Sequence, residues 1–314
     1  MKHLDDIGKT PLYQLKVKNI NNCDFFCKDE SQNPTGSIKD RAAQYILQRA
    51  LEKNIINNDT TIVESSSGNF GVSLSAYCKY YNLNFTCVVD PHISPINEML
   101  IRKSNAHIVK VDTLDVNGGY LLSRLEVVHK ILHETQNSYW TNQYNNPYIT
   151  QAYEVIFEEL LQYLPKCDYI FVGVSSGGTI TGISNYIIRN CLNTKVIAVD
   201  IEGSVIFGKK PKPRFIPGIG SSIIPANLKH AIIHDVIHVN EISTIEACHE
   251  LLKENAIFAG GSSGSVYAAM KKYICDHSIS NAIVVGIFPD RGERYYSTIY
   301  NSEWVKSKYD ERIK

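Results

Sequence analysis

The chain has 314 residues, enough for one large domain or two medium domains that each bury a core. Lysine plus arginine equals aspartate plus glutamate at 32 each, so the charge balance does not favour nucleic acid or an anionic membrane as a partner. The N-terminus lacks the apolar core of a secretion signal, and no apolar run approaches the roughly 18 residues of a membrane helix. The eight cysteines form no Cys-x-x-Cys pair, so we expect a cytoplasmic protein without a structural metal. The balanced charge favours a protein that acts on small molecules.

Short β-rich runs alternate with helical periods, which is typical of parallel α/β architecture. The expected strands are 25–28, 61–64, 85–89, 107–111, 169–174, 196–200 and 282–288. The expected helices are 40–53, 70–81, 95–104, 117–135, 150–163, 179–189, 242–254 and 263–275. An asparagine-rich segment that ends in proline, 140–147, is the candidate domain boundary. We therefore expect an N-terminal α/β lobe over 1–140, whose first strands can cross to the other lobe, a C-terminal α/β lobe over 141–314, and a site in the cleft between them.

Lys39 lies in the run 33–41, NPTGSIKDR. A turn around Pro34 and Gly36, a capping box from Ser37 to Asp40 and the apolar spacing that follows predict a helix with Lys39 in its first turn. A rigid amine at the positive end of a helix dipole is disfavoured as an ammonium, which suits an amine that forms a Schiff base. The nonapeptide alone is equally typical of a solvated lysine at a helix start.

Three stretches rich in glycine and serine precede predicted helices. The first, 65–71 (SSSGNFG), offers hydroxyls and an asparagine carboxamide to a carboxylate and a ring oxygen, although it is also typical of a tight strand-to-helix turn. The second, 175–179 (SSGGT), lets backbone N–H groups approach an anion and predicts a phosphate site that matches neither G-x-G-x-x-G nor the Walker pattern. The third, 260–264 (GGSSG), offers a neutral hydroxyl to a ring nitrogen, but alone is more often a helix cap.

In this order, the motifs resemble the fold-type II pyridoxal phosphate enzymes, the cysteine synthase and cystathionine β-synthase superfamily, from Gly8 to Tyr295. The resemblance implies two open, mainly parallel twisted sheets flanked by helices, a homodimer, and pyridoxal 5'-phosphate in the cleft. It implies that Lys39 forms the Schiff base, that Asn69 contacts the cofactor's 3'-oxygen and that Ser262 faces the pyridine nitrogen. The residues that it implies for the cofactor phosphate are Ser175, Ser176, Gly177, Gly178 and Thr179.

The resemblance also implies a set of substrate contacts, in which Gln143 joins the asparagine loop around the substrate carboxylate. The expected substrate-binding residues are Ser66, Ser67, Gly68, Asn69, Phe70, Gln143, Tyr144, Arg124 and Arg291. A phosphate leaving group and a dicarboxylate nucleophile need cationic partners, for which Arg124 and Arg291 are the candidates. Each is also typical of a surface arginine in a helix or turn.

Departures from the cysteine synthase pattern point to a branch of the superfamily. Phe70 stands where cysteine synthases usually have threonine, Ser175 and Ser176 replace glycine and threonine, and Arg291 replaces a small polar residue. These variants, with 90–95 (DPHISP) and 288–292 (FPDRG), resemble the branch that makes N-(2-amino-2-carboxyethyl)-L-glutamate from O-phosphoserine and glutamate, towards 2,3-diaminopropionate in siderophore biosynthesis.

The expected function is therefore that of a transferase, a β-substituted alanine synthase. It replaces the β-substituent of an activated L-serine, in this branch O-phospho-L-serine, through an aminoacrylate, with an amino acid such as L-glutamate as nucleophile. Lys39 is expected to remove and return the α-proton, while a neutral Ser262 opposite the ring nitrogen favours elimination over transamination. We expect no appended regulatory domain, because the chain ends soon after Trp304.

Three alternatives remain open. The first is an O-acetylserine or O-phosphoserine sulfhydrylase that makes cysteine, and a serine or threonine dehydratase is a more distant second. The third is a catalytically dead paralogue that acts as a partner-binding subunit, against which the presence of Lys39, Asn69 and Ser262 argues.

Overall fold

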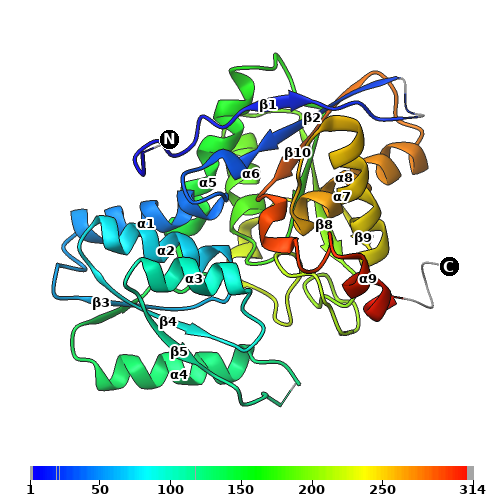
Figure 1. The fold of residues 1–314 in the computed structure, drawn as a ribbon. Helices are drawn as coiled ribbons and strands as arrows, with labels where there is room; N and C mark the ends of the chain where they lie inside the picture. The colour runs from blue at the N-terminus through cyan, green and yellow to red at the C-terminus, as the bar shows by residue number, and fades with distance from the viewer. Residues whose placement is uncertain (1–2, 19, 21, 117, 310–314) are drawn as a thin grey trace.

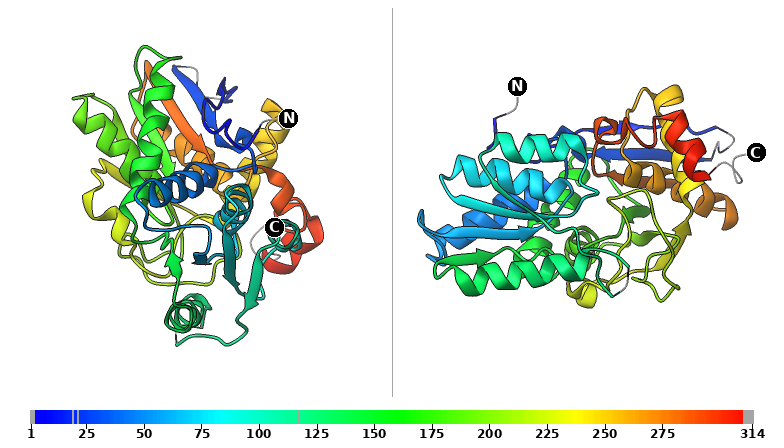
Figure 2. Two further views of the ribbon diagram at one scale, coloured as in Figure 1. Left: turned by 90° about the vertical axis from the view of Figure 1, so that its left-hand side faces the viewer. Right: turned by 60° about the horizontal axis from the view of Figure 1, so that its bottom comes forward.

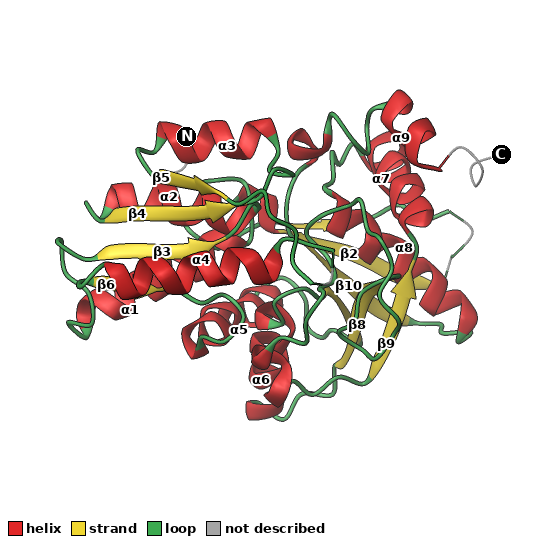
Figure 3. Ribbon diagram, turned by 90° about the horizontal axis from the view of Figure 1, so that it is seen from below, coloured by secondary structure: helices red, strands yellow, loops and turns green. Residues whose placement is uncertain are grey.

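The computed structural model describes residues 3–309 apart from 19, 21 and 117, and in this part of the chain two sheets lie side by side (Figures 1 and 3). The smaller sheet has the order β5-β4-β3-β6 with all neighbours parallel. Its strands are β3 (Thr61–Ser65), β4 (Asn84–Val89), β5 (His107–Lys110) and β6 (Ser138–Trp140). Helices α2 (Asn69–Tyr80) and α3 (Pro95–Lys103) cover one face and α4 (Leu121–Glu134) covers the other (Figure 2).

The larger sheet has the order β1-β2-β10-β7-β8-β9, in which only the β1–β2 pair is antiparallel among the described residues. Its strands are β1 (Leu12–Gln14), β2 (Cys23–Asp29), β7 (Tyr169–Gly173), β8 (Lys195–Ile201), β9 (Asp235–Val239) and β10 (Ala282–Phe288). Helix α6 (Gly178–Arg189) packs on one face with α5 (Pro147–Leu161) beside it, and α8 (Gly261–Asp276) packs on the other with α7 (Glu241–Asn255). The first two strands of the chain thus belong to the sheet that its last strand helps to form.

Two helices and three 3-10 turns complete the described elements. Helix α1 (Lys39–Glu52) packs against both α2 and α5, and α9 (Ser302–Tyr309) lies near the C-terminus (Figure 1). The 3-10 turns are Glu30–Gln32, Ala226–His230 and Gly292–Tyr295. No helix in the described part of the chain is both long and apolar enough to span a bilayer.

The expected α/β class, with two open and mainly parallel sheets, is confirmed. Each strand and helix predicted from periodicity is present, with ends shifted by a few residues. Asn117, the expected start of the fourth helix, lies outside the described residues, and α4 begins at Leu121. The elements that the sequence analysis missed are β1, β6, β9 and α9. Two of them, β1 and β6, have three residues each, too few for an alternating pattern to show.

The expected capping box at the start of α1 is wrong. The Asp40 carboxylate instead accepts hydrogen bonds from the backbone N–H (2.6 Å) and the hydroxyl of Thr35, while Ser37 Oγ accepts one from the Lys39 N–H at 3.3 Å. These bonds close the loop before the helix rather than its first turn, and α1 begins at Lys39 itself.

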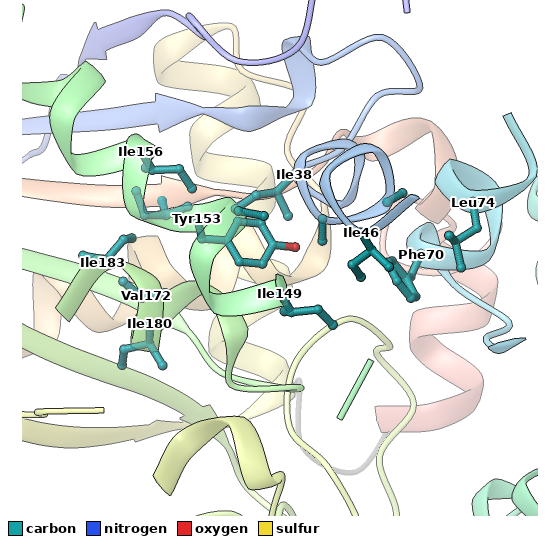
Figure 4. Packing of buried hydrophobic residues seen from close by; sticks show 14 of the residues in the cluster. Ile38, Ile46, Phe70, Leu74, Ile149, Tyr153, Ile156, Val172, Ile180 and Ile183 are labelled. Atoms are coloured by element: carbon teal, nitrogen blue, oxygen red, sulfur yellow. The ribbon is translucent and has the colours of Figure 1, made fainter. Parts of the chain in front are cut away.

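A continuous apolar cluster joins the two halves of the molecule. Figure 4 shows Ile46 of α1 and Leu74 of α2 in the same cluster as Ile156 of α5 and Ile183 of α6. Because α1 and α2 adjoin the smaller sheet while α5 and α6 cover the larger one, the two sheets are held together by a shared core rather than by a flexible linker.

A buried group of four charged side chains lies beside this core. Arg41 of α1 pairs with Glu30 (Nε–Oε2 2.6 Å) and with Glu159 of α5 (Nη2–Oε2 2.8 Å), and Lys28 of β2 pairs with the same Glu159 oxygen at 2.7 Å. Burial alone would raise the pKa of Glu159, but the hydrogen bonds from Arg41 and Lys28 outweigh it and lower that pKa to about 2. The ionised form is therefore the one that the fold requires.

We predict that Glu159→Gln lowers the free energy of unfolding by about 3 kcal/mol at neutral pH, because it leaves two buried cations undercompensated. The stabilisation by Glu159 is present above the carboxyl's ordinary pKa of 4.5 and is lost as the pH falls towards 2. Urea denaturation at several pH values measures both effects. The control is Glu134→Gln, which removes an exposed pair with Lys130 and should leave stability nearly unchanged; equal losses in the two variants would contradict the prediction.

Candidate active site

A cavity of about 360 Å³ lies between the two sheets, at the carboxyl ends of β3, β7 and β10. Four helices begin at its wall and contribute a lining residue from their first turns: Lys39 of α1, Asn69 of α2, Gly178 of α6 and Ser262 of α8. A helix N-terminus carries unpaired N–H groups and a partial positive charge, so this arrangement favours an anionic ligand. The four motifs singled out in the sequence thus meet in one place.

The lysine turn is fixed from the larger sheet. The Ile38 N–H donates to the Pro289 carbonyl at 2.8 Å, and Ser37 forms a β-bridge with Asp290. Burial lowers the pKa of the Lys39 ammonium to about 8, against the opposing charge of Asp290. At pH 7 about a tenth of this amine is therefore neutral and nucleophilic, far more than for an ordinary lysine, and Schiff-base formation requires that neutral form.

The loop 175–179, which the sequence predicts as a phosphate site, lines the cavity at the start of α6. Gly177 has a φ of +79°, and a Cβ on it would lie 2.6 Å from Leu228 Cγ. A Cβ on Gly178 would lie 2.2 Å from Ile149 Cγ2. The absent side chains would therefore point into the packing behind the loop, while the loop itself lines the cavity with Ser175, Ser176 and Thr179.

The asparagine loop lines the opposite wall. Ser66 Oγ accepts a hydrogen bond from the Gly71 N–H at 3.1 Å, which shapes the entry into α2, and the space in front of Gly68 is open. Phe70 contributes a buried ring to the same wall. The Gln143 side chain donates to the Ser65 carbonyl at 2.9 Å, so the predicted partner of the asparagine loop is bound to it directly.

Arg124 of α4 brings a guanidinium into the cavity, beside Tyr144. Its Nη1 lies 2.9 Å from Asp90 Oδ2 and donates to Ser67 Oγ at 3.0 Å. The Nε is buried and has no hydrogen-bond partner among the described residues. The sequence analysis named the segment that contains Asp90 but did not identify this carboxylate as a site residue.

The structure does not bring Arg291 to the cavity. Its guanidinium lies 2.6 Å from Glu293 Oε1, and its side chain is 48% exposed. Arg294 and Tyr295, which follow the quoted run 288–292, line the cavity instead. Arg291 precedes the 3-10 turn Gly292–Tyr295, whereas Arg294 lies within it, and of the two only Arg294 lines the cavity.

The lining residues fit a phosphorylated aldehyde with an aromatic ring. Lys39 supplies an amine of lowered pKa, the loop 175–179 supplies an anion cup, and the buried Ser262 hydroxyl lines the same cavity. Gly218, with a φ of +94°, leaves room here, because a Cβ on it would lie 3.2 Å from the Tyr295 hydroxyl and 3.8 Å from Ser262 Oγ.

Comparison with known proteins gives likenesses over nearly the whole chain. A family described as "Pyridoxal-phosphate dependent enzyme" matches residues 3–290. The chain is 42% identical over 308 residues to N-(2-amino-2-carboxyethyl)-L-glutamate synthase of Ralstonia nicotianae. This alignment covers 96% of this chain and 90% of that protein.

Two solved structures share the fold. The O-acetylserine dependent cystathionine beta-synthase from Helicobacter pylori aligns with a TM-score of 0.87 at 28% identity, over 95% of this chain and 98% of that one. An O-ureido-L-serine synthase aligns with a TM-score of 0.87 at 25% identity, over 95% and 94%.

Glu64, at the end of β3, supports the cavity floor. Its carboxylate accepts hydrogen bonds from Thr141 Oγ1 (2.6 Å), the Ser65 N–H (2.8 Å) and the Gln143 N–H (3.2 Å). Burial raises the pKa of this carboxyl to about 7 in spite of these bonds. The folded protein therefore keeps a proton on Glu64 at pH values where the unfolded chain has lost it.

We predict that this proton makes stability depend on pH. The contribution of Glu64 is fully present below its ordinary pKa of 4.5 and is lost as the pH rises through about 7. Between pH 5 and 8 the wild-type protein should lose on the order of 2 kcal/mol more unfolding free energy than Glu64→Gln. Denaturant titrations across this range test the difference. The exposed Glu246→Gln should follow wild type, and a Glu64→Gln curve parallel to wild type would refute the prediction.

Proposed function

Because the chain belongs to the pyridoxal-phosphate dependent enzymes, we propose that it replaces the phosphate of O-phospho-L-serine with the amino group of L-glutamate. The broader statement rests on the matches: the chain is a pyridoxal phosphate transferase of the β-substituted alanine synthase type, as the sequence motifs predicted. The substrate pair rests on the relative from Ralstonia nicotianae and, in the cavity, on one observation, the guanidinium of Arg124.

In this proposal the four converging motifs hold the cofactor. Lys39 would hold it through Nζ, the loop 175–179 would hold its phosphate, Asn69 would donate to its 3'-oxygen and the Ser262 hydroxyl would face its ring nitrogen. Bound there, pyridoxal phosphate supplies an electron sink for the electron pair left when an amino acid loses its α-proton.

The protein's own part in the reaction is to move one proton and to position charge. Once the amino group of the serine ester has displaced Lys39 from the cofactor, the freed Lys39 Nζ takes the α-proton. The phosphate leaves from the β-carbon, and the amino group of the nucleophile adds there and loses its own proton. Lys39 then returns a proton to the α-carbon. The lowered pKa of Lys39 suits both directions of this transfer, since the free amine accepts a proton and its ammonium readily gives one up.

The substrate carboxylate is held by the asparagine loop. The helix dipole of α2 and the open space at Gly68 favour a carboxylate there, and the hydroxyls of Ser66 and Ser67 lie beside it. Arg124 then offers its charge to the anionic group that the serine carboxylate does not occupy, either the departing phosphate or a carboxylate of the nucleophile. Acetate and hydrosulfide carry less negative charge than a departing phosphate or a dicarboxylate, which is why Arg124 favours this pair over cysteine synthesis.

We predict that Lys39→Ala abolishes turnover without unfolding the protein. The change removes both the group that holds the cofactor and the proton carrier from an otherwise normal helix start. Mass spectrometry of the products tests the loss of turnover. Circular dichroism in the far and near ultraviolet tests whether the fold is retained. Steady-state turnover within tenfold of wild type would exclude Lys39 as the proton carrier.

The substrate pair is tested by kinetics with O-phosphoserine and O-acetylserine, each combined with glutamate and with sulfide. Arg124→Met should lower kcat/KM for O-phosphoserine with glutamate by roughly 30-fold or more, on the order of 2 kcal/mol, and affect O-acetylserine with sulfide far less. Arg291→Ala is the matched control and should change little, because that side chain lies outside the cavity. If the wild-type protein uses O-acetylserine and sulfide best and ignores glutamate, it is a sulfhydrylase and the proposal falls.

A further inference from the structure

The side-chain amide of Asn69 is held at both ends. Its Nδ2 donates to Asp290 Oδ2 at 2.7 Å, and its Oδ1 accepts from Arg294 Nη1. Arg294 is itself anchored, because its Nη2 donates to the Thr35 carbonyl at 2.6 Å. The amide is thus fixed between the end of the larger sheet and the loop that leads to Lys39.

These two partners decide which way the amide faces. A carboxylate only accepts hydrogen bonds and a guanidinium only donates them, so a flipped Asn69 would oppose like groups at both ends. One N–H of Nδ2 is used by Asp290, and the other has no hydrogen-bond partner among the described residues, while Asn69 lines the cavity. Asn69 therefore offers a donor rather than an acceptor to a ligand in the cavity.

Asp290 is suited to hold this orientation because it cannot move. Its side chain is 2% exposed, and Oδ2 also accepts from the Tyr295 hydroxyl at 2.9 Å. Its backbone carbonyl accepts from the Gly260 N–H at 3.0 Å, and a Cβ on Gly260 would lie 2.0 Å from Asp290 Oδ1. The Asp290 carboxylate therefore requires a glycine at position 260, at the start of the stretch 260–264 that leads into α8.

We propose that Asp290 is a positioning residue that acts through Asn69: it keeps the carboxamide in the orientation that donates a hydrogen bond to an acceptor oxygen of the bound cofactor, and Arg294 supports it from the other end. The inference rests on the proposed contact between Asn69 and the cofactor. It is independent of the substrate pair, since every contact that carries it lies within the protein.

The test is a double-mutant cycle on the holoenzyme without substrate, with Asp290→Asn, Asn69→Ala and both together. The readouts are the absorption maximum of the bound cofactor and its dissociation constant. We expect Asp290→Asn to shift the maximum and to weaken cofactor binding by roughly tenfold. On the Asn69→Ala background the same change should have almost no further effect, because the residue through which it acts is gone.

The matched control is Asp200→Asn, which replaces another buried carboxyl, in β8, that contacts neither Asn69 nor the cavity. It should leave the absorption maximum in place. An unshifted Asp290→Asn spectrum, or effects of Asp290→Asn and Asn69→Ala that simply add, would overturn the proposal. If Asp290→Asn does not fold, the same cycle with Arg294→Gln decides, with the same expected and contrary outcomes. These measurements are made without substrate, so an error in the proposed substrate pair would change neither the absorption maximum nor the cofactor dissociation constant. The positioning role of Asp290 and the substrate pair can therefore be refuted independently.

Discussion

The guanidinium of Arg41, buried between the carboxylates of Glu30 and Glu159, is the constraint on which the site depends most. Desolvated charges are stable only in close, complementary contact, so the cluster admits little displacement of the elements that carry it. Arg41 lies two residues after Lys39 in the same helix. The cluster therefore fixes the start of α1 relative to α5 and to the loop after β2. The position of the Lys39 amine thus depends on ion pairs whose residues do not line the cavity.

The cavity attracts anions although the chain as a whole is neutral. Its positive character comes from four helix N-termini and from two guanidinium groups. Asp90 holds the guanidinium of Arg124 in place, and Asn69 holds that of Arg294. Local fields of this kind give specificity through geometry rather than through net charge. A carboxylate such as Asp90, which pairs with Arg124, also holds the cation in place for a ligand that arrives later.

The comparison between sequence and structure separates what local patterns can show from what depends on the assembled fold. The places of Lys39, Asn69 and Ser262 in the first turns of helices could be predicted because each follows a glycine or proline signal and precedes a periodic helix, whereas their roles towards a cofactor came from the family resemblance. The sequence pointed to Arg291 and not to Arg294, because spacing cannot tell which of two nearby arginines a short 3-10 turn directs into the cavity. Lys28 and Glu159 resemble ordinary surface charges in the sequence, and only the packing of β2 against α5 shows that they are buried partners. The sequence likewise does not show the position of Asp290, because its contacts with Ser37, Asn69 and Gly260 join three loops that are far apart in the chain.

The pairing of β2 with β10 has a consequence for biogenesis. These strands come from opposite ends of the chain, yet they lie side by side along their whole length in the middle of the larger sheet. On the ribosome, β2 can pair only with the three-residue strand β1, among the described strands, until β10 has been translated. The smaller sheet, by contrast, is built from neighbouring segments and can assemble earlier. The nascent chain must therefore keep the outer edge of β2 from aggregating until β10 is available, and the cavity, which Pro289 lines directly after β10, can form only once that strand has been translated.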